Sequence, residues 1–171
     1  RTAEEYRDVF LGRLDAVVLA EDLSSSERDL DRLVSRSLAP MSPSRYCIAP
    51  SPAVRLDKSQ VMPFALILHE LMTNAWKYGA FSKDGGIVHI AWKVSAKDGN
   101  PILDFTWREE NGPPVTAPPR HGFGYDLIKF STEQSLHGTV ELVYDPSGFR
   151  FRSSTPLDMA QQVLSALASG P

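Results

Sequence analysis

The residues best suited to chemistry lie on one face of a predicted helix. Glu70, Asn74 and Lys77 stand at positions i, i+4 and i+7 within the segment 68–80. Each helical residue turns the chain by about 100°, so these three side chains fall within about 60° of one another. Most of their neighbours are apolar, and polar groups on a buried helix need polar partners. This face is therefore expected to line a polar cavity.

Each of the three side chains suits a site for nucleotide phosphates. The amide oxygen of Asn74 is a ligand that Mg²⁺ accepts, and Mg²⁺ takes few protein ligands because it keeps several waters. The ammonium group of Lys77 is a point charge for phosphate. The carboxylate of Glu70 is able to orient or deprotonate a nucleophile. A solvated helix face with a Glu–Lys ion pair explains the same spacing, so spacing alone leaves both interpretations open.

Two later segments carry glycines at the ends of predicted elements. The first, 105–115, is a strand that ends in two adjacent carboxylates and a Gly-Pro-Pro turn. The second, Gly122-Phe123-Gly124, opens a helix. Glycine allows a ligand to approach the backbone closely, and the N–H groups of a helix N-terminus bind phosphate. Neither segment matches the dinucleotide-binding fingerprint or the Gly-Lys-Ser/Thr phosphate loop.

Apolar periodicity and turn residues predict the elements that position these groups. Helices are expected at 3–22, 26–38, 59–78 and 124–136, and strands at 46–48, 54–56, 87–94, 102–107, 138–144 and 149–153. A weak final helix is expected at 157–168, and Pro63 is expected to mark either the first turn of the helix at 59–78 or a local kink. Helices and antiparallel hairpins in this order predict an α+β fold, in which helices cover one face of a mixed, mostly antiparallel sheet.

The three segments, in this order, resemble the histidine kinase and GHKL ATPase superfamily, and within it the HWE histidine kinases. That family is recognised by a His in the asparagine box and by a Trp-x-Glu motif. The matches are His69-Glu70-Leu71, Thr73-Asn74-Ala75, Lys77-Tyr78-Gly79-Ala80, Trp107-x-Glu109 and Gly122-Phe123-Gly124. The resemblance covers roughly residues 4–156. It implies a Bergerat-type (GHKL) two-layer α/β sandwich, preceded by a helix of the dimerisation and phosphotransfer hairpin.

The resemblance also implies functional roles. Asn74 would coordinate the Mg²⁺ that bridges the ATP phosphates, and Glu70 would activate or position the attacking histidine. Lys77 and Tyr78 would face the nucleotide, with Lys77 near phosphate. Glu109 would bind the adenine amino group, in place of the Asp of related kinases.

The remaining implied positions concern the family signature and the lid, which is the segment between Gly112 and Gly122 expected to lie over the nucleotide. The lid hinges and the approach of the phosphates would be shaped by Gly112, Gly122, Phe123 and Gly124. His69 and Trp107 are signature positions for which the sequence gives no mechanistic role.

Two departures from the family pattern stand out. Asn111 replaces a usual Gly, and Asn tolerates unusual backbone angles, so nucleotide binding is expected to survive. The second departure is the phosphate-accepting histidine, which normally lies on a helix before the first residue of this chain. None of the four histidines has the family's acceptor context. The chain, which starts without Met, is therefore expected to be a fragment that transfers the γ-phosphate of ATP to a histidine outside itself.

The expected organisation is a phosphotransfer helix at 1–24, an ATP-binding catalytic domain at 25–157 and a tail at 158–171. The expected partners are ATP, the phosphoacceptor helix of the same kinase and a response regulator, with a homodimer in the full-length protein. A cytoplasmic location is expected for this domain, whether the full-length protein is soluble or membrane-anchored.

Composition excludes several other classes of protein. The net charge of −3 gives no electrostatic argument for nucleic acid binding, and the single cysteine, Cys47, excludes an internal disulfide. The chain has no apolar run as long as the roughly 18 residues of a membrane span. A GHKL serine kinase or anti-sigma factor remains as an alternative, as does a non-catalytic phosphotransfer scaffold. Intact Glu70, Asn74 and Glu109 argue against the scaffold.

The composition of the lid predicts its conformation. Between Gly112 and Gly122 the chain is rich in proline and shows no helical periodicity. We therefore expect a short, extended, polyproline-like lid that covers little of the nucleotide.

Overall fold

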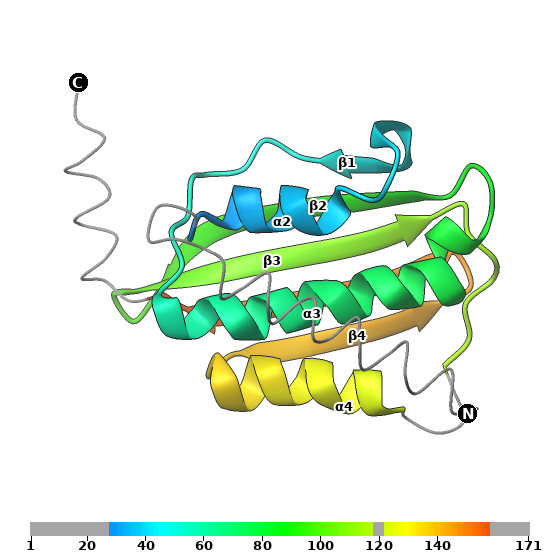
Figure 1. Ribbon diagram of the computed structural model, residues 1–171. Coiled ribbons are helices and arrows are strands. Elements are labelled where there is room, and N and C mark those ends of the chain that lie inside the picture. Colours follow the sequence, from blue (N-terminus) through cyan, green and yellow to red (C-terminus); the bar gives the residue numbers. More distant parts are fainter. Residues whose placement is uncertain (1–27, 118–121, 158–171) are drawn as a thin grey trace.

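The computed structural model describes residues 28–117 and 122–157 (Figure 1). The helix expected at 3–22 and nearly all of the helix expected at 157–168 lie outside these residues. Among the helices of the described segments, none combines the length and the apolarity of a membrane span.

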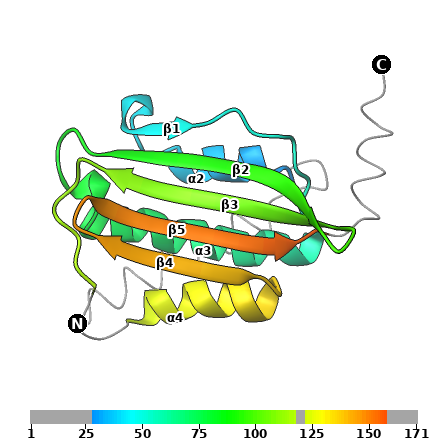
Figure 2. The same cartoon turned by 180° about the vertical axis from the view of Figure 1, so that it is seen from behind.

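A five-stranded sheet forms one layer of the molecule. Its spatial order is β1 (Tyr46–Ile48), β2 (Ile87–Lys97), β3 (Asn100–Glu110), β5 (Gly148–Pro156) and β4 (Thr139–Asp145). Only β1 and β2 run parallel, and the other neighbours are antiparallel. The described helices all lie on one face of the sheet, as Figures 1 and 2 show from opposite sides. This arrangement confirms the expected α+β sandwich.

Two tight turns set the register of the sheet. The β2–β3 hairpin closes through Asp98 and Gly99, whose φ angles of 52° and 80° fit the left-handed turn that suits a twisted hairpin. The β4–β5 turn is held by the Asp145 carboxylate, which accepts hydrogen bonds from the N–H and O–H groups of Ser147 at 2.8 and 2.6 Å. Both hairpins were predicted from their turn residues, and β2, β3 and β5 extend beyond the predicted bounds.

The helix α3 (Lys58–Lys77) lies over the middle of the sheet and carries the polar stripe, which consists of Glu70, Asn74 and Lys77. Asp57 caps its N-terminus, and a reciprocal hydrogen bond with Gln60 completes a capping box. Pro63 is the sixth residue of the helix, so it does not mark the first turn. The predicted apolar stripe of α3 is buried, and Phe64 meets Phe105 of β3 edge to face at 6.3 Å between ring centroids.

The remaining helices are close to their predicted positions. The helix α2 (Leu30–Leu38) begins later than predicted. The helix α4 (Phe123–Phe130) continues into a wider π-helical turn over Ser131–Ser135.

The predicted strand at 54–56 is wrong. This segment forms only an isolated bridge, between Arg55 and Asp29. The amide groups of Leu30 and Leu56 donate to the carbonyls of Val54 and Arg28, so the segment pairs with the chain entering α2 rather than with the sheet.

The described part of the lid lacks a helix, as expected. Residues 113–117 contain neither helix nor strand, and 118–121 lie outside the described residues. Asn111, at the start of the lid, has a φ of 57°, in the left-handed region that Asn tolerates.

We predict that Asp57→Ala lowers the free energy of unfolding by about 1 kcal/mol, the usual value of an N-cap side chain. Hydrogen bonds from the hydroxyl and amide of Ser59 hold the pKa of Asp57 below its ordinary value. A lowered pKa in the folded state means that this stabilisation is fully present above the unfolded value of about 4 and is lost as the pH falls through the folded pKa. Urea denaturation at neutral and acidic pH measures the difference.

Asp84→Ala is the matched control, because Asp84 is exposed and caps no helix. Its stability should differ from wild type by less than about 0.5 kcal/mol. A loss for Asp57→Ala that is equally large in acid would contradict the capping role.

Candidate nucleotide site

The candidate site lies where the C-terminal ends of α3 and β3 approach the start of α4 (Figure 1). A direct contact joins the first two elements: the amide of Ala80, just after α3, donates to Glu109 Oε2 of β3 at 2.7 Å. The third element meets α3 at Gly124, where a Cβ atom would overlap the carboxylate of Glu70. The structure therefore brings the asparagine-box helix, the Trp-x-Glu strand and the Gly-x-Gly segment together.

Glu109 is a carboxylate on the core face of the sheet. Alternation along β3 turns Leu103, Phe105, Trp107 and Glu109 toward the helices, and only 3% of the Glu109 surface is exposed. Its Oε1 accepts a hydrogen bond from the indole N–H of Trp107 at 3.1 Å, and its Oε2 accepts the one from Ala80. Burial raises the pKa of Glu109, and these two hydrogen bonds oppose that shift. A carboxylate has about four acceptor positions, so it is able to accept a further donor.

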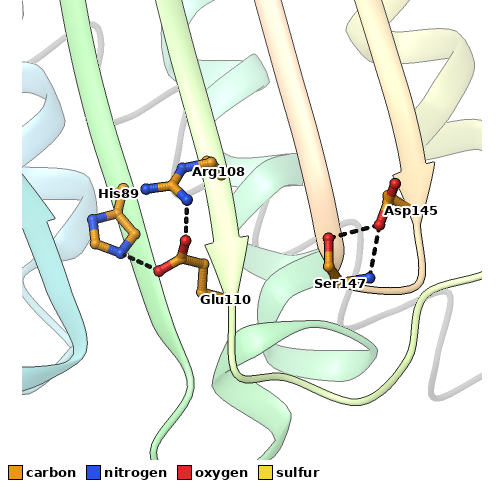
Figure 3. Close-up of polar contacts among 5 residues, drawn as sticks. All are labelled: His89, Arg108, Glu110, Asp145 and Ser147. Carbon is orange, nitrogen blue, oxygen red and sulfur yellow. Dashed lines mark hydrogen bonds and ion pairs between the residues drawn. The ribbon is translucent and has the colours of Figure 1, made fainter.

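The neighbouring carboxylate, Glu110, lies on the opposite face of the sheet. Its Oε2 is 2.9 Å from His89 Nε2, and its Oε1 is paired with Arg108 (Figure 3). The two acidic residues that adjoin in the sequence therefore serve different surfaces. Only Glu109 faces the helices and belongs to the candidate site.

The main chain at Gly79 and Ala80 forms a wall beside Glu109. A Cβ atom on Gly79 would overlap Glu109 Oε2, and one on Gly86 would overlap the carbonyl oxygen of Ala80. A Cβ on Gly112 would lie 2.9 Å from the Cα of Ala80. All three glycines are thus required by close packing of backbone against backbone or carboxylate. Sequence reasoning named Gly112 but missed the other two, although Gly79 stands inside the matched motif.

The polar stripe of α3 runs from buried to exposed. Glu70 is only 5% exposed and lies against Gly124 at the start of α4. Asn74, one turn later, is half-buried, and Lys77 is exposed. The predicted stripe is therefore present, and the exposure of its side chains increases from Glu70 to Lys77.

Two exposed aromatic residues stand at the ends of the helices that border the site. Tyr78, directly after α3, is 68% exposed, and Phe123, the first residue of α4, is 56% exposed. Large exposed aromatic side chains are suited to contact a ligand, though single ones are common on any surface. Gly122 is the N-cap of α4 and has no side-chain cap hydrogen bond, and a helix N-terminus is a position that favours an anion.

The two signature residues differ in what they contact. Trp107 is buried in the core, and its indole N–H reaches Glu109. His69 is half-buried, with its Nε2 atom 3.4 Å from the hydroxyl of Thr73 one turn along the helix. The structure thus gives Trp107 a contact within the candidate site, a feature that the sequence did not reveal.

The donor set fits a magnesium ion that is shared with phosphates. The described residues contain no group of three or more His, Cys, Asp or Glu side chains that would hold a metal by themselves. Mg²⁺ bound to a nucleotide takes most of its ligands from phosphates and water, and Asn74 offers one amide oxygen. Asn74 is therefore the residue of the stripe that would hold it.

Comparison with known proteins relates the chain to bacterial kinases. No family model matches the sequence. The chain is similar to the blue-light-activated histidine kinase of Brucella ovis, with 26% identity over 160 residues that cover 90% of this chain and 33% of the relative. It thus spans about a third of the length of the curated relatives it matches.

Solved structures agree on the fold. The histidine kinase domain of the Erythrobacter litoralis blue-light-activated histidine kinase has a TM-score of 0.66 and 15% identity, over 93% of this chain and 83% of that one. The ATP binding domain of PrrB from Mycobacterium tuberculosis has a TM-score of 0.53 and 21% identity, over 76% and 95%. Sequence and fold therefore agree: the chain is similar in sequence to histidine kinases and shares the fold of their ATP-binding domains.

Proposed function

We propose that this domain binds ATP with Mg²⁺ and transfers the γ-phosphate to a histidine on the phosphotransfer helix of the same kinase. The observation that carries the proposal is the buried Glu109 carboxylate, held by Trp107 and Ala80 beside a wall of glycine-lined main chain. The sequence likeness to histidine kinases supports it. A GHKL serine kinase and a phosphotransfer scaffold are not favoured.

Base recognition is assigned to Glu109. The amino group of adenine is a hydrogen-bond donor, and a carboxylate accepts it, whereas the corresponding guanine position carries a carbonyl oxygen that a carboxylate repels. Since a buried group left without its partner is costly, this single contact should favour adenine over guanine. The main chain at Gly79 packs directly against Glu109, and Gly112 packs against Ala80, so main chain borders the carboxylate on this side.

Phosphate binding is assigned to the exposed end of the stripe and to the start of α4. Mg²⁺ on Asn74 would neutralise charge that develops on the phosphates, and Lys77 adds a cation. The amide groups at Gly122 and Gly124 face the phosphates as a helix N-terminus does. Tyr78 and Phe123 border the nucleotide.

Glu70 is assigned to the incoming histidine. Its carboxylate is able to orient the imidazole or accept its proton while the γ-phosphate is transferred. In the structure the start of α4 covers Glu70 at Gly124. The histidine therefore reaches Glu70 only when this end of α4 moves aside.

The whole kinase would pass its phosphate to a response regulator and act as a homodimer. Because ATP is its substrate, we place this domain in the cytoplasm. These assignments concern a longer protein, because the match to this chain covers only about a third of the length of its relatives.

Asn74→Ala should weaken ATP binding in the presence of Mg²⁺ by at least about tenfold, because the metal loses its protein ligand. Calorimetric titration with ATP, in Mg²⁺ and in EDTA, measures this effect. The wild-type protein should bind more weakly in EDTA, and the variant should respond little to Mg²⁺. The control is Asn100→Ala, in the exposed β2–β3 hairpin, which should behave as wild type. Full Mg²⁺ dependence in Asn74→Ala would refute the metal assignment.

Trp107→Phe should weaken ATP binding about five- to tenfold, or about 1–1.4 kcal/mol, and leave GTP binding nearly unchanged, because the lost indole N–H no longer orients Glu109. Trp92→Phe is the matched control: Trp92 is also buried, and its indole N–H donates at 2.8 Å to the carbonyl of Pro52. Both variants should lose stability, but only Trp107→Phe should lose the preference for ATP. An equal loss for both nucleotides would contradict the base-reading role.

The wild-type protein and Trp107→Phe also allow a test of the pH dependence of nucleotide preference. Only the charged form of Glu109 accepts the adenine amino group without a competing proton, and burial raises the pKa of this group. The preference for ATP should therefore be present above that pKa and fade as the pH falls through it. Loss of a donor to the carboxylate raises its pKa further, so the fading should begin at a higher pH in Trp107→Phe.

A further inference from the structure

Arg45 reaches the candidate site from a distant part of the sequence. It ends the short 3₁₀ turn before β1, and its side chain extends over the segment 79–86 that follows α3. Its Nε donates to the carbonyl of Gly86 at 2.8 Å, and its Nη2 donates to the carbonyls of Lys83 and Ala80 at 2.7 and 3.1 Å. The guanidinium carbon also lies 5.8 Å from the centre of the Phe81 ring. One side chain thus binds three carbonyls of a single loop.

These contacts act on the residue that holds Glu109. The carbonyl of Ala80 accepts from Arg45, and the amide of Ala80 donates to Glu109. Ala80 is therefore held on two sides, by a guanidinium on its carbonyl and by a carboxylate on its amide. Hydrogen bonds that involve a charged group are stronger than neutral ones, so each of these contacts restricts the peptide groups of Ala80.

The hydrogen bonds within the loop are local. The amide and hydroxyl of Ser82 donate to the carbonyl of Gly79, and the amide of Gly86 donates to the carbonyl of Lys83 at 3.3 Å. Gly85 has a φ of 82° and open space around its Cα, and residues 82–85 are exposed. Gly86 packs so closely on Ala80 that a small shift of one displaces the other. The guanidinium adds a connection between the carbonyls of Lys83 and Ala80, which these local bonds do not provide.

We propose that Arg45 is a positioning residue for base recognition: by holding the loop 79–86, it keeps the Ala80 amide on Glu109 and so keeps this carboxylate oriented toward adenine. The proposal rests on the proposed function, since it assumes that Glu109 reads the base. It assigns to Arg45 no contact with the nucleotide. The planar guanidinium group has several N–H donors and reaches several carbonyls at once, whereas the single ammonium group of a lysine does not reproduce that geometry.

The test uses Arg45→Ala and Arg45→Lys, with Arg152→Ala as the matched control. Arg152 is an exposed arginine on the opposite face of the sheet, 3.7 Å from Glu141. Calorimetry measures the dissociation constants of ATP and of inorganic triphosphate, both with Mg²⁺, because triphosphate makes no base contact. Hydrogen exchange of the Ala80 amide, followed by NMR, reports the contact with Glu109 without any nucleotide.

In Arg45→Ala, the dissociation constant of ATP should rise about tenfold, that of triphosphate should stay within about twofold, and the Ala80 amide should exchange at least about tenfold faster. Arg45→Lys should fall between this variant and wild type, and Arg152→Ala should match wild type. If Arg45→Ala does not fold, the lysine variant alone decides, by a smaller change in the same direction.

The proposal is overturned if ATP and triphosphate weaken by the same factor, or if neither changes. It is also overturned if the Ala80 amide is protected equally in all four proteins. A wild-type protein that binds no ATP would instead overturn the proposed function. In that case faster exchange in Arg45→Ala would still support the hold of Arg45 on the loop, and equal exchange would refute it.

Discussion

A carboxylate buried on the core face of the sheet is the constraint on which the rest of the site depends. A buried charge is costly unless hydrogen bonds compensate it. Glu109 obtains one hydrogen bond from its own strand, through Trp107, and one from the segment just after α3, through Ala80. The same two bonds fix the direction of the carboxylate and join the sheet to the helix that carries the polar stripe. If Glu109 reads the base as proposed, stability and recognition share one set of contacts.

The parts of the fold that depend on local periodicity were predictable. The 3.6-residue period of α3 and the two-residue period of β2 and β3 follow from the apolar positions, and the Asp98-Gly99 turn joins these two strands. The polar stripe from Glu70 to Lys77 follows from the same helical period. The alternation that turns Phe105 and Trp107 inward also turns Glu109 inward and Glu110 outward, although the sequence shows them only as neighbours.

The parts that depend on contacts between distant segments were not predictable. Arg45 and Ala80 are separated by 35 residues, and no pattern around either residue predicts their hydrogen bond. The close packing of Gly86 on Ala80 is a tertiary contact of the same kind. The segment 54–56 was instead predicted as a strand that does not form. Its apolar residues suggest a strand, but it pairs with the chain before α2 and not with the sheet. In each case the deciding partner lies beyond the window that periodicity covers.

The wall beside Glu109 is built from main chain, and this bears on how such domains diverge. Gly79, Gly86 and Gly112 bring backbone atoms together, so the shape of the wall depends on the absence of side chains rather than on their identity. Substitutions elsewhere on the rim can accumulate without altering that shape. Drift in sequence would then change the exposed border, at Tyr78 and Phe123, well before it changes the surface behind them.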